Sequence, residues 1–151
     1  MLRAKINDEL KTAMKAQDQR RVSTLRLVNS ALKNADIEAR GQGKAALGDD
    51  EVLSVLQKMI KQRQESAELY DKGGRPELAA REREEIAIIS AYLPRQMSEE
   101  EAKTAIAGLV KELGATGMKD MGKVMAALKE RYAGQMDFGK ASPMVKTLLA
   151  G

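Results

Sequence analysis

A helix stop and a helix start stand side by side in the segment Tyr92-Leu93-Pro94-Arg95-Gln96-Met97-Ser98-Glu99-Glu100-Glu101. Pro94 cannot continue a helix, because proline lacks the backbone N–H and its ring clashes with the preceding turn. Ser98 and Glu101 form a capping box, in which each side chain binds the backbone N–H of the other residue. We therefore predict a boundary here, between an N-terminal helical domain over residues 1–94 and a C-terminal domain over residues 98–151.

Apolar residues recur with helical spacing on both sides of this segment. Leu2, Ile6, Leu10 and Met14, for example, stand four residues apart and predict an amphipathic first helix. From the same periodicity and from capping signals, further helices are expected from about Asp18 to Gly41, Asp49 to Gly73, Pro76 to Pro94, Ser98 to Gly114, Asp120 to Gly134, and from Asp137 onwards. The expected fold is all-α, with about four helices in the first domain and three short helices in the second.

The chain of 151 residues has no histidine and no cysteine. These residues supply the commonest general acids and bases, the readiest thiolate nucleophiles and most zinc and iron ligands. We therefore favour a binding or adaptor protein over an enzyme, and we expect no metal and no cofactor. The start of the chain has no apolar run like that of a signal peptide, and no run of about 18 apolar residues could span a membrane. We expect a soluble, cytoplasmic protein without a membrane partner.

Three stretches, Leu25–Lys33, Gln57–Ser66 and Tyr70–Pro94, together resemble the GatB/YqeY family. The segment Asp120-Met121-Gly122-Lys123-Val124-Met125 is similar to the C-terminal module of the B subunit of glutamyl/aspartyl-tRNA amidotransferase. The resemblance covers nearly the whole chain in colinear order. It implies a stand-alone, two-domain, all-α bacterial protein that lacks the catalytic part of the amidotransferase and whose tail helps to hold tRNA.

Basic residues are in excess in the tail, as in proteins that bind a phosphate backbone. A helix N-terminus beside Lys119 and Lys123 is a suitable anion site. Gly122 would either let an RNA phosphate approach closely or pack tightly at the helix start. The RNA-binding candidates are Lys119, Gly122, Lys123, Lys129, Arg131, Lys140 and Lys146. The alternative interpretation is an ordinary solvated helix face.

The segment Gly117-Met118-Lys119-Asp120-Met121-Gly122-Lys123 also fits the glycine and lysine spacing of a phosphate-binding P-loop. However, Val124 stands where that motif has the Ser or Thr that binds magnesium, and a helix precedes it where a strand is needed. We therefore interpret the match as coincidental. Tyr132 could stack on a base, but its helical spacing from Leu128 favours a place in the core.

A second basic patch is expected in the first domain, where Asp18 is the only acidic residue between residues 11 and 26. It is either a second electrostatic footprint for RNA or a solvated helix face. Its members are Lys11, Lys15, Arg20, Arg21 and Arg26.

Polar side chains share a face of the third expected helix, beside a markedly apolar fourth helix. Together with polar residues near the fourth helix they form either an interdomain surface or a structural network that fixes the two helices, and we favour the network. These candidates are Lys61, Gln62, Arg63, Tyr70, Arg75, Glu85 and Tyr92.

The sequence contains no recognisable catalytic constellation. Clustered acids at Asp49-Asp50-Glu51 and Glu99-Glu100-Glu101 are explained by helix capping and the helix dipole. Ser142 and Lys146 stand four residues apart, but no oxyanion hole or orienting group accompanies them. Three hypotheses remain open: a non-catalytic accessory protein that binds tRNA or another structured RNA, a glutamine-dependent amidotransferase (a carbon–nitrogen ligase), and an adaptor that binds a protein partner.

Overall fold

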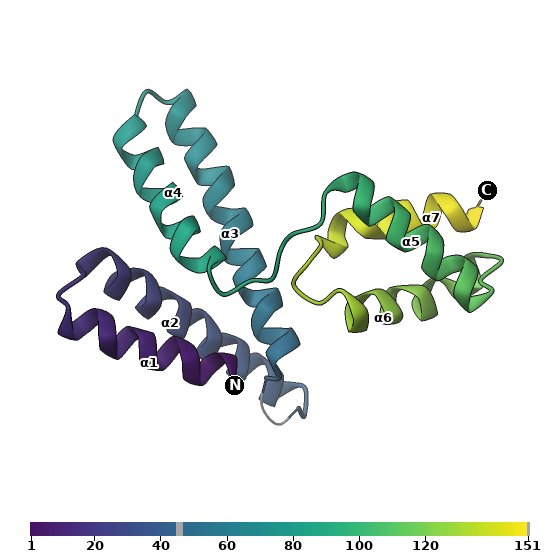
Figure 1. The fold of residues 1–151 in the computed structure, drawn as a ribbon, viewed down its shortest axis with the longest axis horizontal. Helices are drawn as coiled ribbons and strands as arrows, with labels where there is room; N and C mark the ends of the chain where they lie inside the picture. Colours follow the sequence, from purple (N-terminus) through teal and green to yellow (C-terminus); the bar gives the residue numbers. More distant parts are fainter. Residues whose placement is uncertain (45–46, 151) are drawn as a thin grey trace. The chain divides into compact units, whose positions relative to one another are not determined.

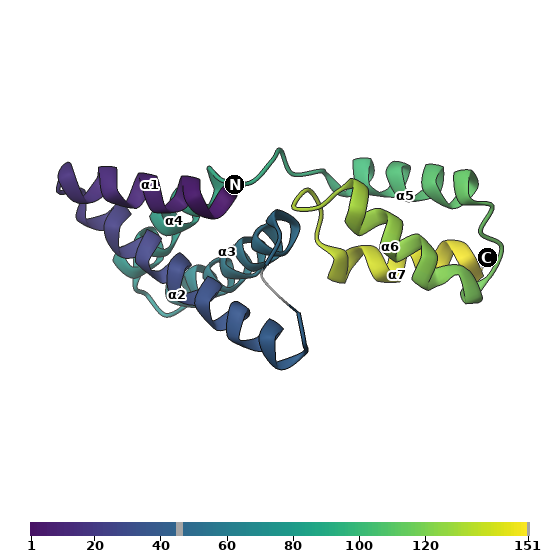
Figure 2. The ribbon, with the colours of Figure 1, turned by 90° about the horizontal axis from the view of Figure 1, so that it is seen from below.

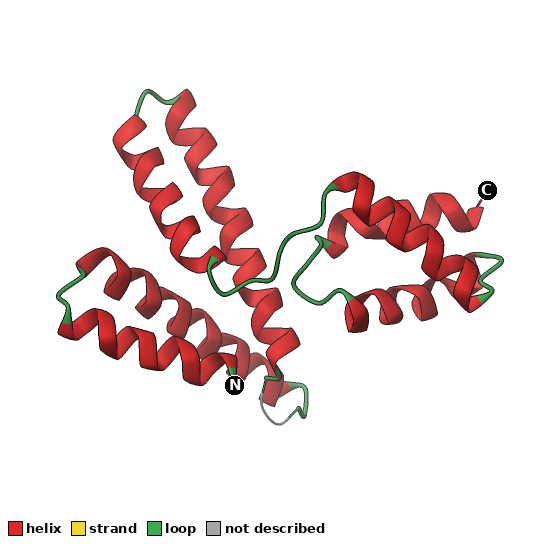
Figure 3. Cartoon of the chain, viewed as in Figure 1, coloured by secondary structure: helices red, strands yellow, loops and turns green. Residues whose placement is uncertain are grey.

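The computed structural model describes residues 1–44 and 47–150. Within these residues the regular structure consists of seven α-helices and one short 3₁₀ helix, without a β-strand (Figure 1, Figure 3). The prediction of an all-α fold is therefore confirmed. The chain divides into two compact units, Met1–Leu93 (unit 1) and Pro94–Gly151 (unit 2), and each is described by itself.

Unit 1 is built from two helical hairpins (Figure 1). Helices α1 (Leu2–Lys15) and α2 (Gln19–Gly41) form the first, and α3 (Asp49–Lys72) and α4 (Pro76–Ser90) form the second. The four helices enclose an almost wholly aliphatic core, as the composition requires. Its buried residues are Ile6, Leu25, Val28, Leu32, Val52, Leu56, Met59, Ile89 and Tyr92.

Local signals in the sequence explain where the helices of unit 1 begin and end. Asp18 caps α2, because its carboxylate accepts a hydrogen bond of 3.2 Å from the backbone N–H of Arg21. Gly74 has a φ of +72°, the left-handed conformation that glycine adopts without strain, and it turns the chain from α3 to α4. Pro76 occupies the first turn of α4, where its missing N–H costs no hydrogen bond.

Unit 2 contains α5 (Glu99–Leu113), the 3₁₀ helix η1 (Met118–Asp120), α6 (Met121–Arg131) and α7 (Phe138–Ala150). The three α-helices pack around a second core, and Figure 2 shows them side by side. This core consists of Ala102, Ile106, Leu109, Val124, Leu128, Met136, Ala141, Val145 and Leu149. Tyr132 is half-buried and packs against it, so its ring belongs to the core.

The capping box at the start of α5 is present as predicted. The backbone N–H of Glu101 donates to Ser98 Oγ, and the backbone N–H of Ser98 donates to Glu101 Oε1, each over 3.1 Å. Gly114 ends α5 with a φ of +65°. Asp137 caps α7 by accepting a 2.8 Å hydrogen bond from the N–H of Gly139. Two helix ends differ from the sequence-based expectation: α4 ends at Ser90 instead of Pro94, and α6 ends at Arg131 instead of near Gly134.

The segment between α4 and α5 is fastened to unit 2 by its last residues. The side chain of Gln96 donates to the carbonyl of Gly134, and the backbone N–H of Met97 donates to the carbonyl of Gln135 over 2.8 Å. Arg95 forms an ion pair with Glu101. These contacts hold residues 95–97 against the α6–α7 loop and the first turn of α5.

Candidate nucleic-acid interface

A tight turn places the first lysines of the tail at the start of α6. The carboxylate of Asp120 accepts a 3.0 Å hydrogen bond from the backbone N–H of Thr116. Asp120 therefore closes the turn that precedes α6, and its side chain does not cap the helix. The N–H groups of Thr116 and Gly117 and the charges of Lys119 and Lys123 lower the pKa of the Asp120 carboxyl.

The outward side of α6 combines lysines with small residues. Lys119, Lys123 and Lys129 are exposed, and none of them forms an ion pair with a residue that the structure describes. Gly122 and Ala126, one turn apart, are also exposed. A Cβ atom added to Gly122 would meet no described atom within 4 Å outside its chain neighbours and its own helix. Tight packing therefore does not explain this glycine.

This set of residues is what we call the α6 face: Lys119, Gly122, Lys123, Ala126 and Lys129. The two small residues leave the helix backbone open, and the lysines stand around them. A polyanion could therefore approach the helix closely and meet cations on its flanks. Sequence reasoning missed Ala126, although its four-residue spacing from Gly122 would have revealed it.

The other tail candidates lie outside this face or are already engaged. Arg131 makes a bidentate ion pair with Glu112 on α5: its Nη1 lies 2.6 Å from Oε2 and its Nη2 lies 2.7 Å from Oε1. Arg131 lowers the pKa of the Glu112 carboxyl through these hydrogen bonds and its charge. Lys140 and Lys146 are exposed on α7, without an ion pair to the described residues.

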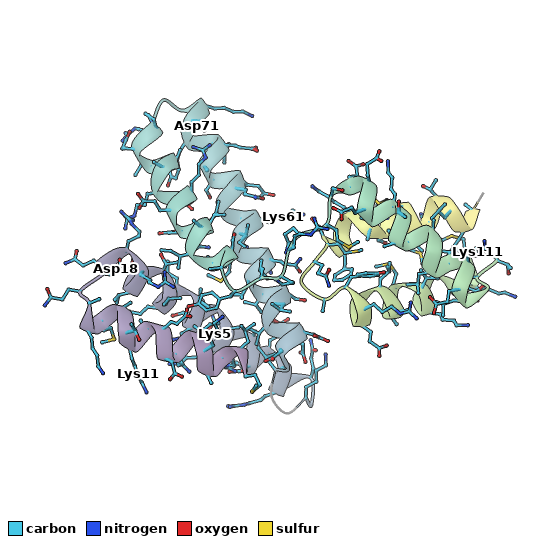
Figure 4. The ribbon with its side chains drawn as sticks, in the orientation of Figure 1. Lys5, Lys11, Asp18, Lys61, Asp71 and Lys111 are labelled. Atoms are coloured by element: carbon cyan, nitrogen blue, oxygen red, sulfur yellow. The ribbon has the colours of Figure 1, made fainter. Side chains whose placement is uncertain are left out.

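The five members of the second basic patch differ in whether they form ion pairs within unit 1. Arg20 on α2 forms an ion pair with Glu84 on α4, with 2.9 Å between Nε and Oε2. Arg21 forms one with Glu9 on α1, with 3.5 Å between Nη2 and Oε2. The remaining members are exposed and form no ion pair within residues 1–44 and 47–150: Lys11, Lys15 and Arg26. Figure 4 shows Lys11 extending from α1. Two of the five cations thus link helices of unit 1.

A buried ion pair joins α3 to α4. Arg63 Nε lies 3.0 Å from Glu85 Oε2, and their side chains are only 15% and 9% exposed. Arg63 also donates to the carbonyl of Met59 over 3.3 Å. This arrangement matches a structural network between the two helices. The neighbouring candidates are less buried: Lys61 and Gln62 are exposed, Tyr70 is half-buried, and Arg75 lies 3.9 Å from Glu77.

Tyr92 forms the centre of a second polar cluster in unit 1. Its hydroxyl donates to the Glu9 carboxylate, which also contacts Arg21. Lys5 lies above the ring, 5.8 Å from its centroid. Burial, and then the hydrogen bond to Glu9, raise the pKa of Tyr92. The cluster fixes the end of the second hairpin to α1 and α2.

Unit 2 also has a groove of about 710 Å³ beside the first turns of α5 and α7. Methionines dominate its apolar lining, and Lys140 is the one cation there. The lining includes Met97, Met136, Ala141, Pro143 and Met144. Flexible thioether side chains adapt to many shapes, and the charged residues of the lining are Glu99, Asp137 and Lys140.

Two kinds of feature are absent from the described residues. No group of three or more acidic side chains in them could hold a metal ion. None of their helices is long and apolar enough to cross a membrane.

The fold and the α6 face define an all-α protein of two helical units whose tail presents a lysine-bearing helix. A family model described as Yqey-like protein matches residues 3–149. The chain therefore belongs to the YqeY family.

Fungal relatives carry the name Altered inheritance of mitochondria protein 41, mitochondrial. The protein of Eremothecium gossypii is 30% identical over 97% of this chain and 80% of its own length. That of Lachancea thermotolerans is 36% identical over 73% of this chain, which spans 58% of that relative. That of Clavispora lusitaniae is 28% identical over 93% of this chain and 81% of its own length.

These names correct one expectation. The sequence predicted a cytoplasmic protein, but the relatives are named mitochondrial proteins, which contradicts that prediction. The prediction failed because it rested on the absence of an apolar segment, which does not distinguish the cytoplasm from the mitochondrial interior. The relatives are fungal and lend no support to the expected bacterial source.

Proposed function

We propose that this YqeY-family protein is a non-catalytic accessory factor that binds structured RNA, tRNA in the first instance, through the α6 face. The observation that carries the proposal is the exposed Gly122 among three lysines without ion pairs. Gly122 is the second residue of α6, and its missing side chain leaves the first turn of the helix open to a phosphate. The relatives' names support a mitochondrial place of action.

Salt-dependent binding to a total tRNA pool tests the proposal. Each lost phosphate contact reduces the slope of log K against log salt by roughly 0.7 to 0.9. Replacing Lys119, Lys123 and Lys129 by Ala should therefore weaken binding and flatten the slope. A control variant with the same net charge replaces three other exposed lysines, Lys58, Lys72 and Lys111, and should retain the wild-type slope. Equal binding by the two triple variants would refute the α6 face as the site.

A second test distinguishes close approach of RNA to the backbone at Gly122 from attraction by the lysine charges of the α6 face. Gly122→Ala leaves every charge in place, and the added methyl group fits the free protein without a clash. We expect weaker tRNA binding but unchanged or slightly higher stability. Gly108→Ala on α5 is the matched control, because Gly108 is also exposed with open space at its Cβ position. If both variants bind tRNA like wild type, no phosphate approaches Gly122.

We do not propose amidotransferase activity for the chain by itself. That hypothesis rests on the resemblance to the amidotransferase tail. In the described structure, Ser142 and Lys146 share no hydrogen bond, although they stand one turn apart on α7. The assay follows glutamate release and glutaminyl-tRNA formation from glutamine, ATP and glutamyl-tRNA. Turnover that disappears in Ser142→Ala or Lys146→Ala would restore the enzyme hypothesis.

A further inference from the structure

The outward side of α2 carries a row of cations at seven-residue intervals. Arg26, Lys33 and Arg40 are all exposed. Residues seven apart on an α-helix differ by only about 20° around the axis, and each interval spans about 10 Å along it. The three charges therefore form a nearly straight line on an exposed side of α2, away from its core residues.

These cations are not engaged within the protein. None of the three forms an ion pair with a residue in the described parts of the chain. Asp36, the nearest acid in the sequence to Lys33, pairs with Arg3 of α1 over 2.8 Å. The three cations therefore stabilise unit 1 through no ion pair with the described residues.

One large aliphatic side chain, Ile37, lies in this row, and a second, Leu27, lies on another exposed side of α2. Ile37 is 65% exposed and Leu27 is 45% exposed, whereas Leu25, Val28 and Leu32 on the same helix are fully buried. By helix geometry Ile37 stands about 40° from Lys33, almost in line with the cations. The α2 face, defined here as Arg26, Lys33, Ile37 and Arg40, thus carries three cations and one exposed aliphatic side chain.

We infer that the α2 face is a docking surface for an acidic amphipathic helix of a protein partner. Charge complementarity selects the partner: a helix laid along α2 would meet one cation every two turns with its own acidic residues. Its apolar side chains would cover Ile37. An RNA backbone would match the three cations but would leave the exposed Ile37 without a role. The inference concerns unit 1 and is independent of RNA binding by the α6 face.

A designed peptide serves as the probe. It has three heptads, with one glutamate per heptad on the side that faces the cations and leucines beside them. A peptide of the same composition with its residues scrambled has the same net charge but no amphipathic face. Binding of each labelled peptide to the full-length protein is measured by fluorescence anisotropy at low and moderate salt. We expect the patterned peptide to bind at least about tenfold more tightly. Equal binding of the two peptides would overturn the inference.

Point variants locate the binding. Ile37→Gln removes the exposed aliphatic group with a good helix former, and Lys33→Glu reverses the central charge. Each should weaken binding of the patterned peptide by about tenfold or more, as expected for central interface residues. The controls are Leu69→Gln, at another highly exposed aliphatic residue, and Lys111→Glu, with the same change in net charge. Both should bind like wild type.

The same variants show whether the α2 face binds a protein partner or RNA. If Lys33→Glu weakens tRNA binding far more than Lys111→Glu does, while Ile37→Gln leaves peptide binding unchanged, the α2 face contacts phosphates and the inference is wrong. If Ile37→Gln weakens peptide binding and tRNA binding stays at the level of the controls, the docking surface is established. A loss of tRNA binding in the α6-face variants does not affect either outcome.

Discussion

At the scale of single residues, Thr24 has a buried hydroxyl group that makes no hydrogen bond within the described residues. Thr24 lies on α2 and is fully buried. A buried, unsatisfied polar group costs about 1–3 kcal/mol. We expect Thr24→Val, which keeps the shape and removes the hydroxyl, to raise the free energy of unfolding by about 1 kcal/mol. Urea denaturation followed by circular dichroism measures this change.

Thr24→Ser provides the control for this prediction. It retains the hydroxyl and deletes the methyl group, so it should lower the stability by about 1 kcal/mol through lost burial. If Thr24→Val were instead destabilising, the hydroxyl would be hydrogen-bonded in solution.

Ionisation of Glu101 makes the stability of unit 2 depend on pH. Hydrogen bonds from Arg95, and then from the backbone of Ser98, lower the pKa of Glu101 from 4.5 to about 2. Between these two values the unfolded chain binds a proton that the folded chain does not. The contribution of Glu101 to stability is therefore fully present above about pH 4.5 and is lost as the pH falls towards 2.

We expect Glu101→Gln to reduce the loss of stability of unit 2 between about pH 4.5 and 2. The free energy of unfolding at a series of pH values measures this dependence. Glu100→Gln, at an exposed neighbour without an ion pair among the described residues, should behave like wild type. A Glu101→Gln variant with an unaltered pH profile would contradict the assignment.

At the scale of helices, the Arg63–Glu85 pair decides how firmly α3 holds α4. Removing one partner of a buried pair leaves an uncompensated charge, which costs about 3–5 kcal/mol. We expect Arg63→Met to destabilise unit 1 by about 3 kcal/mol, since both side chains are nearly buried. The double variant Arg63→Met, Glu85→Met should recover much of this loss. Denaturation of both variants tests the prediction, and a double variant less stable than the single would contradict it.

Helix bounds were largely predictable because the signals that set them are local. Asp18, Ser98 and Asp137 cap helices as their sequence context indicates. Asp120 precedes α6 without capping it, and its carboxylate instead accepts a hydrogen bond from the backbone N–H of Thr116. The 3₁₀ turn of η1 was missed.

Contacts between helices were not predictable from periodicity. The pairs Arg20–Glu84 and Arg131–Glu112 depend on the rotation and offset of two helices, which the sequence pattern leaves open. Two proposed RNA contacts therefore proved to be engaged within the protein. The row formed by Lys33 and Arg40 was missed because charges were counted along short segments and not along one helix face.

At the scale of the whole molecule, each unit has a core made only of its own residues. We therefore expect destabilisation in one unit to leave the other unaffected. Leu128→Ala should destabilise unit 2 by about 2–5 kcal/mol, the usual cost of truncating a buried leucine. Hydrogen exchange of the full chain should then accelerate in α5–α7 only. Leu25→Ala should have the converse effect, and acceleration of both units by either variant would show that their cores are coupled.

Because these cores are consecutive along the chain, synthesis can be expected to fold them one after the other. Chains grow on the ribosome at about 5–20 residues per second, and N-terminal domains fold first. The buried residues of the first core, and the apolar side chains that pack against them, all lie within Met1–Leu93, and 58 residues follow, 151 minus 93. Their synthesis takes about 3 to 12 seconds, far longer than the milliseconds in which helical domains fold. The nascent chain should therefore present a finished α2 face to a partner before the tail helices exist.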